Sequence, residues 1–141
     1  MQRLEIRPYR ESDEDAVVAL WYECGLVRPG NDPIKDIGRK VRIQRDLFLV
    51  GFIDGQLIAT VMAGYEGHRG WINYLAVATD SREQGFGRLL MDKAEARLRE
   101  MGCPKINLQV RRSNAEAAEF YRSIGYAEDD VLSMGKRLVE D

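Results

Sequence analysis

Residues 71–102, WINYLAVATDSREQGFGRLLMDKAEARLREMG, constrain the fold more than any other stretch of the chain. The first eight of these residues are rich in β-branched and aromatic side chains, which favour a strand, and a polar turn follows them. From Phe86 to Met101, apolar side chains recur at spacings of three and four residues, which predicts a helix with one buried face. The stretch therefore predicts a strand, a glycine-containing loop and a helix.

The loop between this strand and helix has the pattern RxxGxG, formed by Arg82, Gly85 and Gly87. The first N–H groups of a helix lack intrahelical acceptors and carry partial positive charge. Glycines without β-carbons let an anion approach these amides, and Arg82 and Arg88 add positive charge. The pattern favours a diphosphate site, and glycines that serve only close packing are the alternative. It is neither the dinucleotide motif GxGxxG nor the phosphate loop GxxxxGK[ST].

Further along the chain, a short strand over residues 105–110 precedes RRSNAEAAEFYRSIGY, where Ser113 and Glu116 have the spacing of a capping box. The order of strand, RxxGxG helix, strand and NAEAAEFYRSIGY helix resembles the GNAT superfamily of acyl-CoA-dependent N-acetyltransferases over residues 4–138. Within it, RPGNDP, GYEGHRG, GCPKI and SMGKRL are similar to the bacterial YpeA group. The resemblance implies one α/β (α+β) domain over residues 1–141. Its mixed, mostly antiparallel sheet of six to seven strands would be flanked by about four helices and would splay at an acyl-CoA cleft.

The same resemblance implies that acetyl-CoA is the acyl donor, without a metal, and that it binds where two parallel strands separate. Strand backbone would pair with the pantetheine arm, as an added strand pairs with a sheet edge, and loop amides would hold the diphosphate. The implied donor-binding residues are Leu75, Ala76, Val77, Arg82, Glu83, Gln84, Gly85, Phe86, Gly87, Arg88, Asn114 and Tyr121.

The implied reaction is direct attack of a primary amine, from a small molecule or a protein, on the thioester. The resemblance places the family's general acid at Tyr121, in the FY of AEFYRSIGY. A phenol with a pKa of about 10 is protonated at neutral pH and can donate to the leaving thiolate. Tyr121 also lies on an apolar helical stripe with Phe120, so core packing is the alternative. Glu66, in the turn before the central strand, and Tyr74 on that strand are the candidate bases.

The acceptor side of the implied site lies in LVRPGNDPIKDIGRK, where Asp32 and Pro33 predict the N-cap and first residue of a helix to about Arg45. In the family this region borders the acceptor pocket, which makes Arg28, Asn31 and Asp32 candidate acceptor contacts. Turn and capping chemistry is the alternative explanation for the same residues.

The rest of the chain predicts the remaining strands. LFLVGFI and LIATVMAGY flank Asp54 and Gly55, which predicts a hairpin and, with the strand from Trp71, a three-stranded antiparallel meander. Alternation at Leu4 and Ile6 predicts a first strand, and residues 131–139 are predicted to form a closing strand.

Composition argues against several classes of function. The 21 basic and 23 acidic residues give a net charge of −2, unlike the basic surface of a nucleic-acid binder. The chain has no membrane-length apolar run and its N-terminus has no signal-peptide core, so we expect a cytoplasmic protein without membrane contact. Cys24, Cys103 and the single His68 form no metal or disulfide pattern. Exposed edge strands leave a homodimer open.

Two classes of function fit these observations. The first is an enzyme that acetylates an amine, and the second is a non-catalytic acyl-CoA sensor or protein-interaction module. Tyr121 and Asn114 together favour the enzyme, because a sensor needs no acid at the sulfur. Another phosphate ligand at Gly85 fits less well, since it leaves the second helix unexplained.

Overall fold

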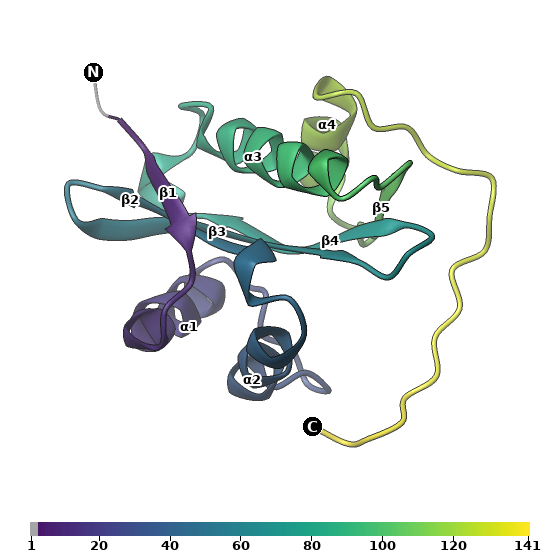
Figure 1. Cartoon of the computed structure of the whole chain (residues 1–141), viewed down its shortest axis with the longest axis horizontal. Coiled ribbons are helices and arrows are strands. Elements are labelled where there is room, and N and C mark those ends of the chain that lie inside the picture. Colours follow the sequence, from purple (N-terminus) through teal and green to yellow (C-terminus); the bar gives the residue numbers. More distant parts are fainter. Residues whose placement is uncertain (1–2) are drawn as a thin grey trace.

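A computed structural model describes residues 3–141 of the chain. Five strands form one sheet in the order β1-β2-β3-β4-β5, with α3 and α4 on one face and α1 and α2 on the other (Figure 1). The strands are β1 (Glu5–Pro8), β2 (Phe48–Ile53), β3 (Gln56–Tyr65), β4 (Gly70–Val77) and β5 (Ile106–Leu108). The helices are α1 (Glu14–Glu23), α2 (Pro33–Ile43), α3 (Phe86–Glu100) and α4 (Ala115–Ser123), with 3-10 turns η1 (Glu11–Asp13), η2 (Arg45–Leu47) and η3 (Thr79–Ser81).

The sheet is mixed and mostly antiparallel, as predicted. β1 to β4 pair antiparallel in chain order, and the hairpin between β2 and β3 turns at Asp54 and Gly55, which both have positive φ. β5 pairs parallel to β4 because α3 carries the chain back across the sheet between them.

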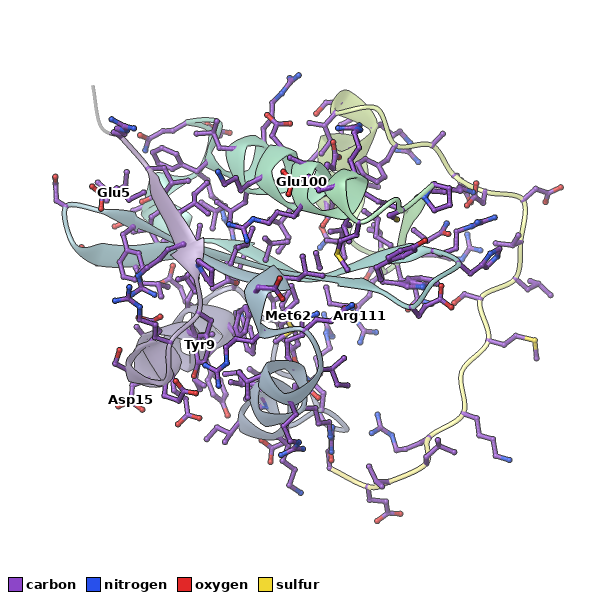
Figure 2. The ribbon with its side chains drawn as sticks, in the orientation of Figure 1. Glu5, Tyr9, Asp15, Met62, Glu100 and Arg111 are labelled. Carbon is purple, nitrogen blue, oxygen red and sulfur yellow. The ribbon has the colours of Figure 1, made fainter. Side chains whose placement is uncertain are left out.

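The core lies on both faces of β2 and β3, whose apolar runs are almost entirely buried. From one side, α3 packs Leu90, Ala94 and Leu98 against the sheet. On the other, Trp21 of α1 is fully buried, and Tyr9 stacks on Phe48 with ring centroids 4.5 Å apart (Figure 2). In the part of the chain that the structure describes, no helix is both long and apolar enough to cross a membrane.

The predicted closing strand is wrong. Residues 127–141 form no helix or strand, so the sheet has five strands within residues 3–141 rather than six to seven. Leu132, Met134 and Leu138 would share one face of such a strand, but no described strand pairs with this stretch, and Gly135 within it weakens a strand. Residues 127–140 are exposed (Figure 2), whereas the side chain of Asp141 is only 5% exposed in its ion pair with Arg39.

Candidate functional site

β5 pairs with only the first part of β4. Gly70, Trp71 and Ile72 pair with Ile106, Asn107 and Leu108, and no described strand pairs with β4 on this side from residue 73 onward. The two parallel strands therefore separate along the stretch that holds Leu75, Ala76 and Val77. The carbonyl oxygen of Val77 already accepts hydrogen bonds from Arg82 Nε at 3.1 Å and Cys24 Sγ at 3.4 Å.

A β-bulge shapes β4 at the start of this open edge. Thr60 faces Ala76 and Met62 faces Asn73, so β4 has one residue more than β3 over the same length. Tyr74 lies in this bulge with φ of 52°, and its carbonyl oxygen accepts a hydrogen bond from the buried Thr60 hydroxyl at 2.9 Å.

The side chain of Trp21 fixes the bulge from the α1 side. Its indole N–H donates to Thr60 Oγ1 at 2.9 Å, and its ring stacks on the ring of Tyr74 with centroids 3.8 Å apart. The bulge thus directs the Tyr74 side chain to the α1–α2 face. Thr60 could not be singled out from the sequence, because its only signal is a hydroxyl within the apolar run LIATVMAG.

A hydrogen-bond network connects Tyr74 to α2. The Tyr74 hydroxyl donates to Asp36 Oδ2 at 2.7 Å and accepts from Asn31 Nδ2 at 2.7 Å. Asp36 Oδ1 accepts from Arg39 at 3.1 Å, and Arg39 donates two hydrogen bonds of 2.8 Å to Asp141. Burial, reinforced by the hydrogen bond to Asp36, raises the pKa of Tyr74, so its hydroxyl is protonated at neutral pH.

The predicted acceptor residues all take part in local structure. Asp32 caps α2 by accepting hydrogen bonds from Ile34 N at 3.0 Å and Lys35 N at 3.2 Å, as its N-cap position predicts. Asn31 Oδ1 accepts from Arg28 N at 2.9 Å, which closes the turn before the helix. Of the three, Asn31 is the one whose side chain also reaches Tyr74.

Glu66 lies apart from this network, in the exposed turn between β3 and β4. Its Oε1 accepts hydrogen bonds from the backbone N–H groups of Arg69 and His68, and these bonds lower the pKa of the carboxyl. The turn precedes Gly70, whereas the open edge of β4 begins beyond Ile72. The structure therefore does not bring the two candidate bases together.

The start of α3 leaves its amides uncapped. Gly85 is the N-cap residue, has φ of 83° and provides no side-chain cap, and its carbonyl accepts the first intrahelical hydrogen bond from Leu89 N at 3.1 Å. A β-carbon on Gly85 would meet nothing within 4 Å, so this face is open. The N–H groups that follow have no intrahelical acceptor, so the start of α3 is a place where an anion can bind.

The second glycine of the motif has a different role. A β-carbon on Gly87 would lie 3.3 Å from Phe120 Cζ and 3.7 Å from Val77 Cγ2. Gly87 therefore allows α3 to pack closely against α4 and β4. Of the two explanations for these glycines, close packing applies to Gly87, whereas Gly85 leaves open space that a ligand can enter.

Tyr121 lies half-buried on α4 between two aromatic rings, with edge-to-face centroid distances of 5.2 Å to Phe120 and 5.9 Å to Tyr126. Burial raises the pKa of Tyr121 to about 12. Its hydroxyl makes no hydrogen bond to any other residue among 3–141, whereas the hydroxyl of Tyr126 donates to Glu95 Oε2 at 2.7 Å.

Asn114, rather than the expected Ser113, is the N-cap of α4. Its Oδ1 accepts a hydrogen bond from Ala117 N at 3.1 Å, so the side-chain amide nitrogen is the part left for a ligand. Over residues 3–141, no group of three or more His, Cys, Asp or Glu side chains is arranged to hold a metal ion.

Comparisons with known proteins agree with this architecture. The model of the "Acetyltransferase (GNAT) family" matches residues 1–126. Acetyltransferase ECA0875 of Pectobacterium atrosepticum is 44% identical over 138 residues, which cover 98% of each chain. Ard1 from Thermoplasma volcanium has a similar structure, with a TM-score of 0.77 at 24% identity over 88% of this chain and 82% of that one. The aminoglycoside N-acetyltransferase AAC(6')-Iy in complex with CoA also has a TM-score of 0.77, at 14% identity, over 99% and 97% of the two chains.

Proposed function

Because this chain belongs to the acetyltransferase (GNAT) family, we propose that it transfers an acetyl group from acetyl-CoA to a primary amine of a small molecule or a protein. The observation that carries the proposal is the uncapped first turn of α3 beside the unpaired edge of β4. A diphosphate suits the first feature and an amide-rich arm suits the second, so one extended ligand can use both.

On the donor side, the amides from Gln84 to Arg88 would hold the diphosphate, and the side chain of Arg88 would add charge. The backbone of Leu75 and Ala76 would pair with the pantetheine arm, because the carbonyl of Val77 is already occupied by Arg82. The side-chain amide of Asn114 would bond the arm from the α4 side. When bound, acetyl-CoA supplies the thioester carbonyl that the amine attacks.

In this proposal Tyr121 is the general acid. Its raised pKa keeps the phenol protonated, and its unpaired hydroxyl is free to donate to the departing sulfur. A protonated phenol suits this step because negative charge develops on the sulfur as the thiolate leaves, after the amine has attacked the carbonyl.

On the acceptor side, Tyr74 is better placed than Glu66, because it stands at the open edge of β4 while Glu66 closes a turn. The Tyr74 hydroxyl is a donor to Asp36, so it takes a proton from the amine only as it passes its own to that carboxylate. We therefore place Asp36 beside Tyr74 in the path of the amine proton.

Calorimetric and thermal-shift titrations with acetyl-CoA, CoA and ATP test the donor site, and a thiol-release assay over a panel of amines and peptides tests turnover. We expect acetyl-CoA and CoA to stabilise the protein by about 4 kcal/mol at a thousandfold excess over the dissociation constant, and ATP to do less. Binding without turnover of any amine would favour a sensor. Binding of none of the three would refute the donor site.

A further inference from the structure

Residues 127–141 form a tail that runs on from α4 in a wide arc past the sheet and reaches α2 (Figure 1). There, Arg39 of α2 donates two hydrogen bonds of 2.8 Å to the side-chain carboxylate of Asp141, one from each terminal nitrogen. This carboxylate is almost fully buried, although the rest of the tail lies in solvent. Two parallel hydrogen bonds of this kind are the geometry by which an arginine recognises a carboxylate.

Positive charge gathers around this carboxylate from both α2 and the tail. The two hydrogen bonds hold the pKa of the Asp141 carboxyl below its usual range, and the charges of Lys35 and Arg137 act in the same direction. Arg137 lies against the turn that precedes α2, because a β-carbon on Gly30 would be 3.0 Å from its Nη2 atom. The cluster of Lys35, Arg39 and Arg137 is therefore a cationic site that the protein's own carboxylate occupies.

This cationic site adjoins the hydrogen-bond network at the open edge of β4. Arg39 Nη1 donates to Asp141 and also to Asp36 Oδ1, so the two carboxylates lie at most the length of two hydrogen bonds apart. The other oxygen of Asp36 accepts from the Tyr74 hydroxyl, which is the group proposed to receive the amine. A carboxylate that replaced that of Asp141 would therefore lie close to the attacking amine.

A ligand can displace Asp141, because the rest of the tail is weakly held. Residues 127–140 are exposed, and the hydrogen bonds of the tail near β5 come from exposed side chains, including the ion pair of Asp129 with Lys105. Such exposed pairs contribute little to stability. A flexible tether gives its end group an effective concentration on the order of millimolar. An acceptor carboxylate at a similar concentration can therefore compete with Asp141 for Arg39.

We propose that Arg39 binds a carboxylate of the acceptor, so that the acceptor is an amine with a carboxylate group a few bonds away, and that Asp141 occupies this site in the free protein. Free amino acids and peptides that begin with an acidic residue share this chemistry. This acceptor class rests on the proposed acetyl transfer and specifies its amine. When the acceptor binds, its carboxylate takes both hydrogen bonds of Arg39, the tail leaves α2, and the amine lies beside Tyr74 and Asp36.

Thiol release with matched pairs of amines tests the acceptor class. The first arm compares alanine, leucine and lysine with their α-amides, and the second compares an amidated peptide that begins with aspartate with the same peptide beginning with asparagine. We expect kcat/KM to be at least about tenfold higher for the carboxylate of a pair, the effect of a charge-assisted hydrogen bond. The amine of an α-amide is the less basic one, so amine reactivity alone would favour the amide. A preference in either arm supports the inference and identifies the source of the carboxylate, whereas equal rates in both arms overturn it.

Variants of the two paired side chains test the site itself. Arg39→Gln should raise the KM for the carboxylate acceptor by about tenfold or more and leave the KM for acetyl-CoA unchanged, since the acceptor loses its bidentate partner. Asp141→Asn should lower the same KM severalfold, by about threefold to tenfold, because the competing charge is gone. In the double variant, Asp141→Asn should bring no further gain. The control is Arg42→Gln, which removes the charge of an exposed arginine on the same helix.

Calorimetry on CoA-saturated protein, with alanine, leucine and lysine as the probes, gives a readout that needs no turnover. We expect tighter binding to Asp141→Asn and about tenfold weaker binding to Arg39→Gln, with thermal unfolding to show that each variant is folded. Absence of binding by every probe, or binding that Arg39→Gln leaves unchanged, would overturn the inference. If only amines without a carboxylate are acetylated, the acceptor class fails and the acetyl transfer stands. If the probes bind through Arg39 and no amine is acetylated, the carboxylate site stands and the acetyl transfer fails.

Discussion

The two faces of the sheet differ in whether the polar groups at the candidate site are hydrogen-bonded within the protein. On the α1–α2 face, Trp21, Thr60, Tyr74 and Asp36 form hydrogen bonds with one another, so the position of Tyr74 is fixed before any ligand arrives. On the α3–α4 face, the first turn of α3 has no side-chain cap, and the hydroxyl of Tyr121, unlike that of its neighbour Tyr126, makes no hydrogen bond to another residue among 3–141. One face is organised in advance, and the other is left for a ligand to complete.

This difference separates positions where a substitution should reduce stability from positions where it should reduce activity. Removing a polar group from the paired face leaves its buried partners without a hydrogen bond, which lowers the free energy of unfolding. Removing a polar group from the unpaired face breaks no hydrogen bond in the free protein and affects only the complex with the ligand. Variants matched in chemistry but placed on the two faces can therefore test the comparison directly.

The largest effect is expected for Tyr121→Phe. Loss of the hydroxyl should lower kcat by about 100-fold or more, because the thiolate would then leave without a proton donor, while the KM for acetyl-CoA should change little. The control is Tyr126→Phe, which removes the same group from a neighbouring ring whose hydroxyl is bonded to Glu95. Steady-state thiol release with a confirmed amine measures both, and an unchanged kcat in Tyr121→Phe would exclude the acid role.

The next effect concerns the paired face. Thr60→Val keeps the size of the side chain but leaves the indole N–H of Trp21 and the carbonyl of Tyr74 without their partner. Each buried group left unpaired costs about 1–3 kcal/mol, so urea unfolding should show a loss of about 2–4 kcal/mol. Thr79→Val makes the same change at an exposed site and should stay within about 0.5 kcal/mol. Equal losses in the two variants would mean that the bulge does not depend on Thr60.

A smaller effect is expected at the open loop. Gly85→Ala should weaken acetyl-CoA binding by about tenfold and cost about 1 kcal/mol of stability, because alanine is strained at φ of 83° and its methyl group enters the open face. Gly55→Ala is the matched control, with φ of 79° and equally open space, but in the β2–β3 hairpin. Both variants should lose similar stability in thermal unfolding, and only Gly85→Ala should lose affinity in calorimetry. If both bind acetyl-CoA like the unmodified protein, the diphosphate lies elsewhere.

The sequence predicted the unpaired face better than the paired one, because the features of the unpaired face are local. The start of α3 at Phe86 and the loop glycine Gly85 just before it follow from a few consecutive residues. The hairpin at Asp54 and Gly55 is local in the same sense. In each case the chain conformation is decided by neighbours within one turn.

On the paired face the sequence indicated Tyr74 and Asn31 but not their partners Thr60 and Asp36, because these contacts join residues that are far apart in the chain. Trp21 and Thr60 are 39 residues apart and Asp36 and Tyr74 are 38 apart, and no spacing rule connects them. The closing strand over residues 131–139 failed for a related reason, since a strand needs a partner as well as apolar residues.

The smallest effect is expected for the pH dependence of kcat, which should show no fall as the pH approaches 10. An ordinary tyrosine ionises near pH 10, so a general acid of that kind would lose activity as the pH approaches 10. Burial raises the pKa of Tyr121 to about 12, so the phenol stays protonated and kcat should change less than about twofold between pH 8 and 10.

The unfolded chain releases this proton near pH 10 while the folded protein retains it, so this group's contribution to stability should decline from about pH 10 to 12. A pH profile of kcat, with circular dichroism at each point, separates the two effects. A falling limb near pH 10 in folded protein, present with Tyr126→Phe as well, would mean that the acid is a group less buried than Tyr121.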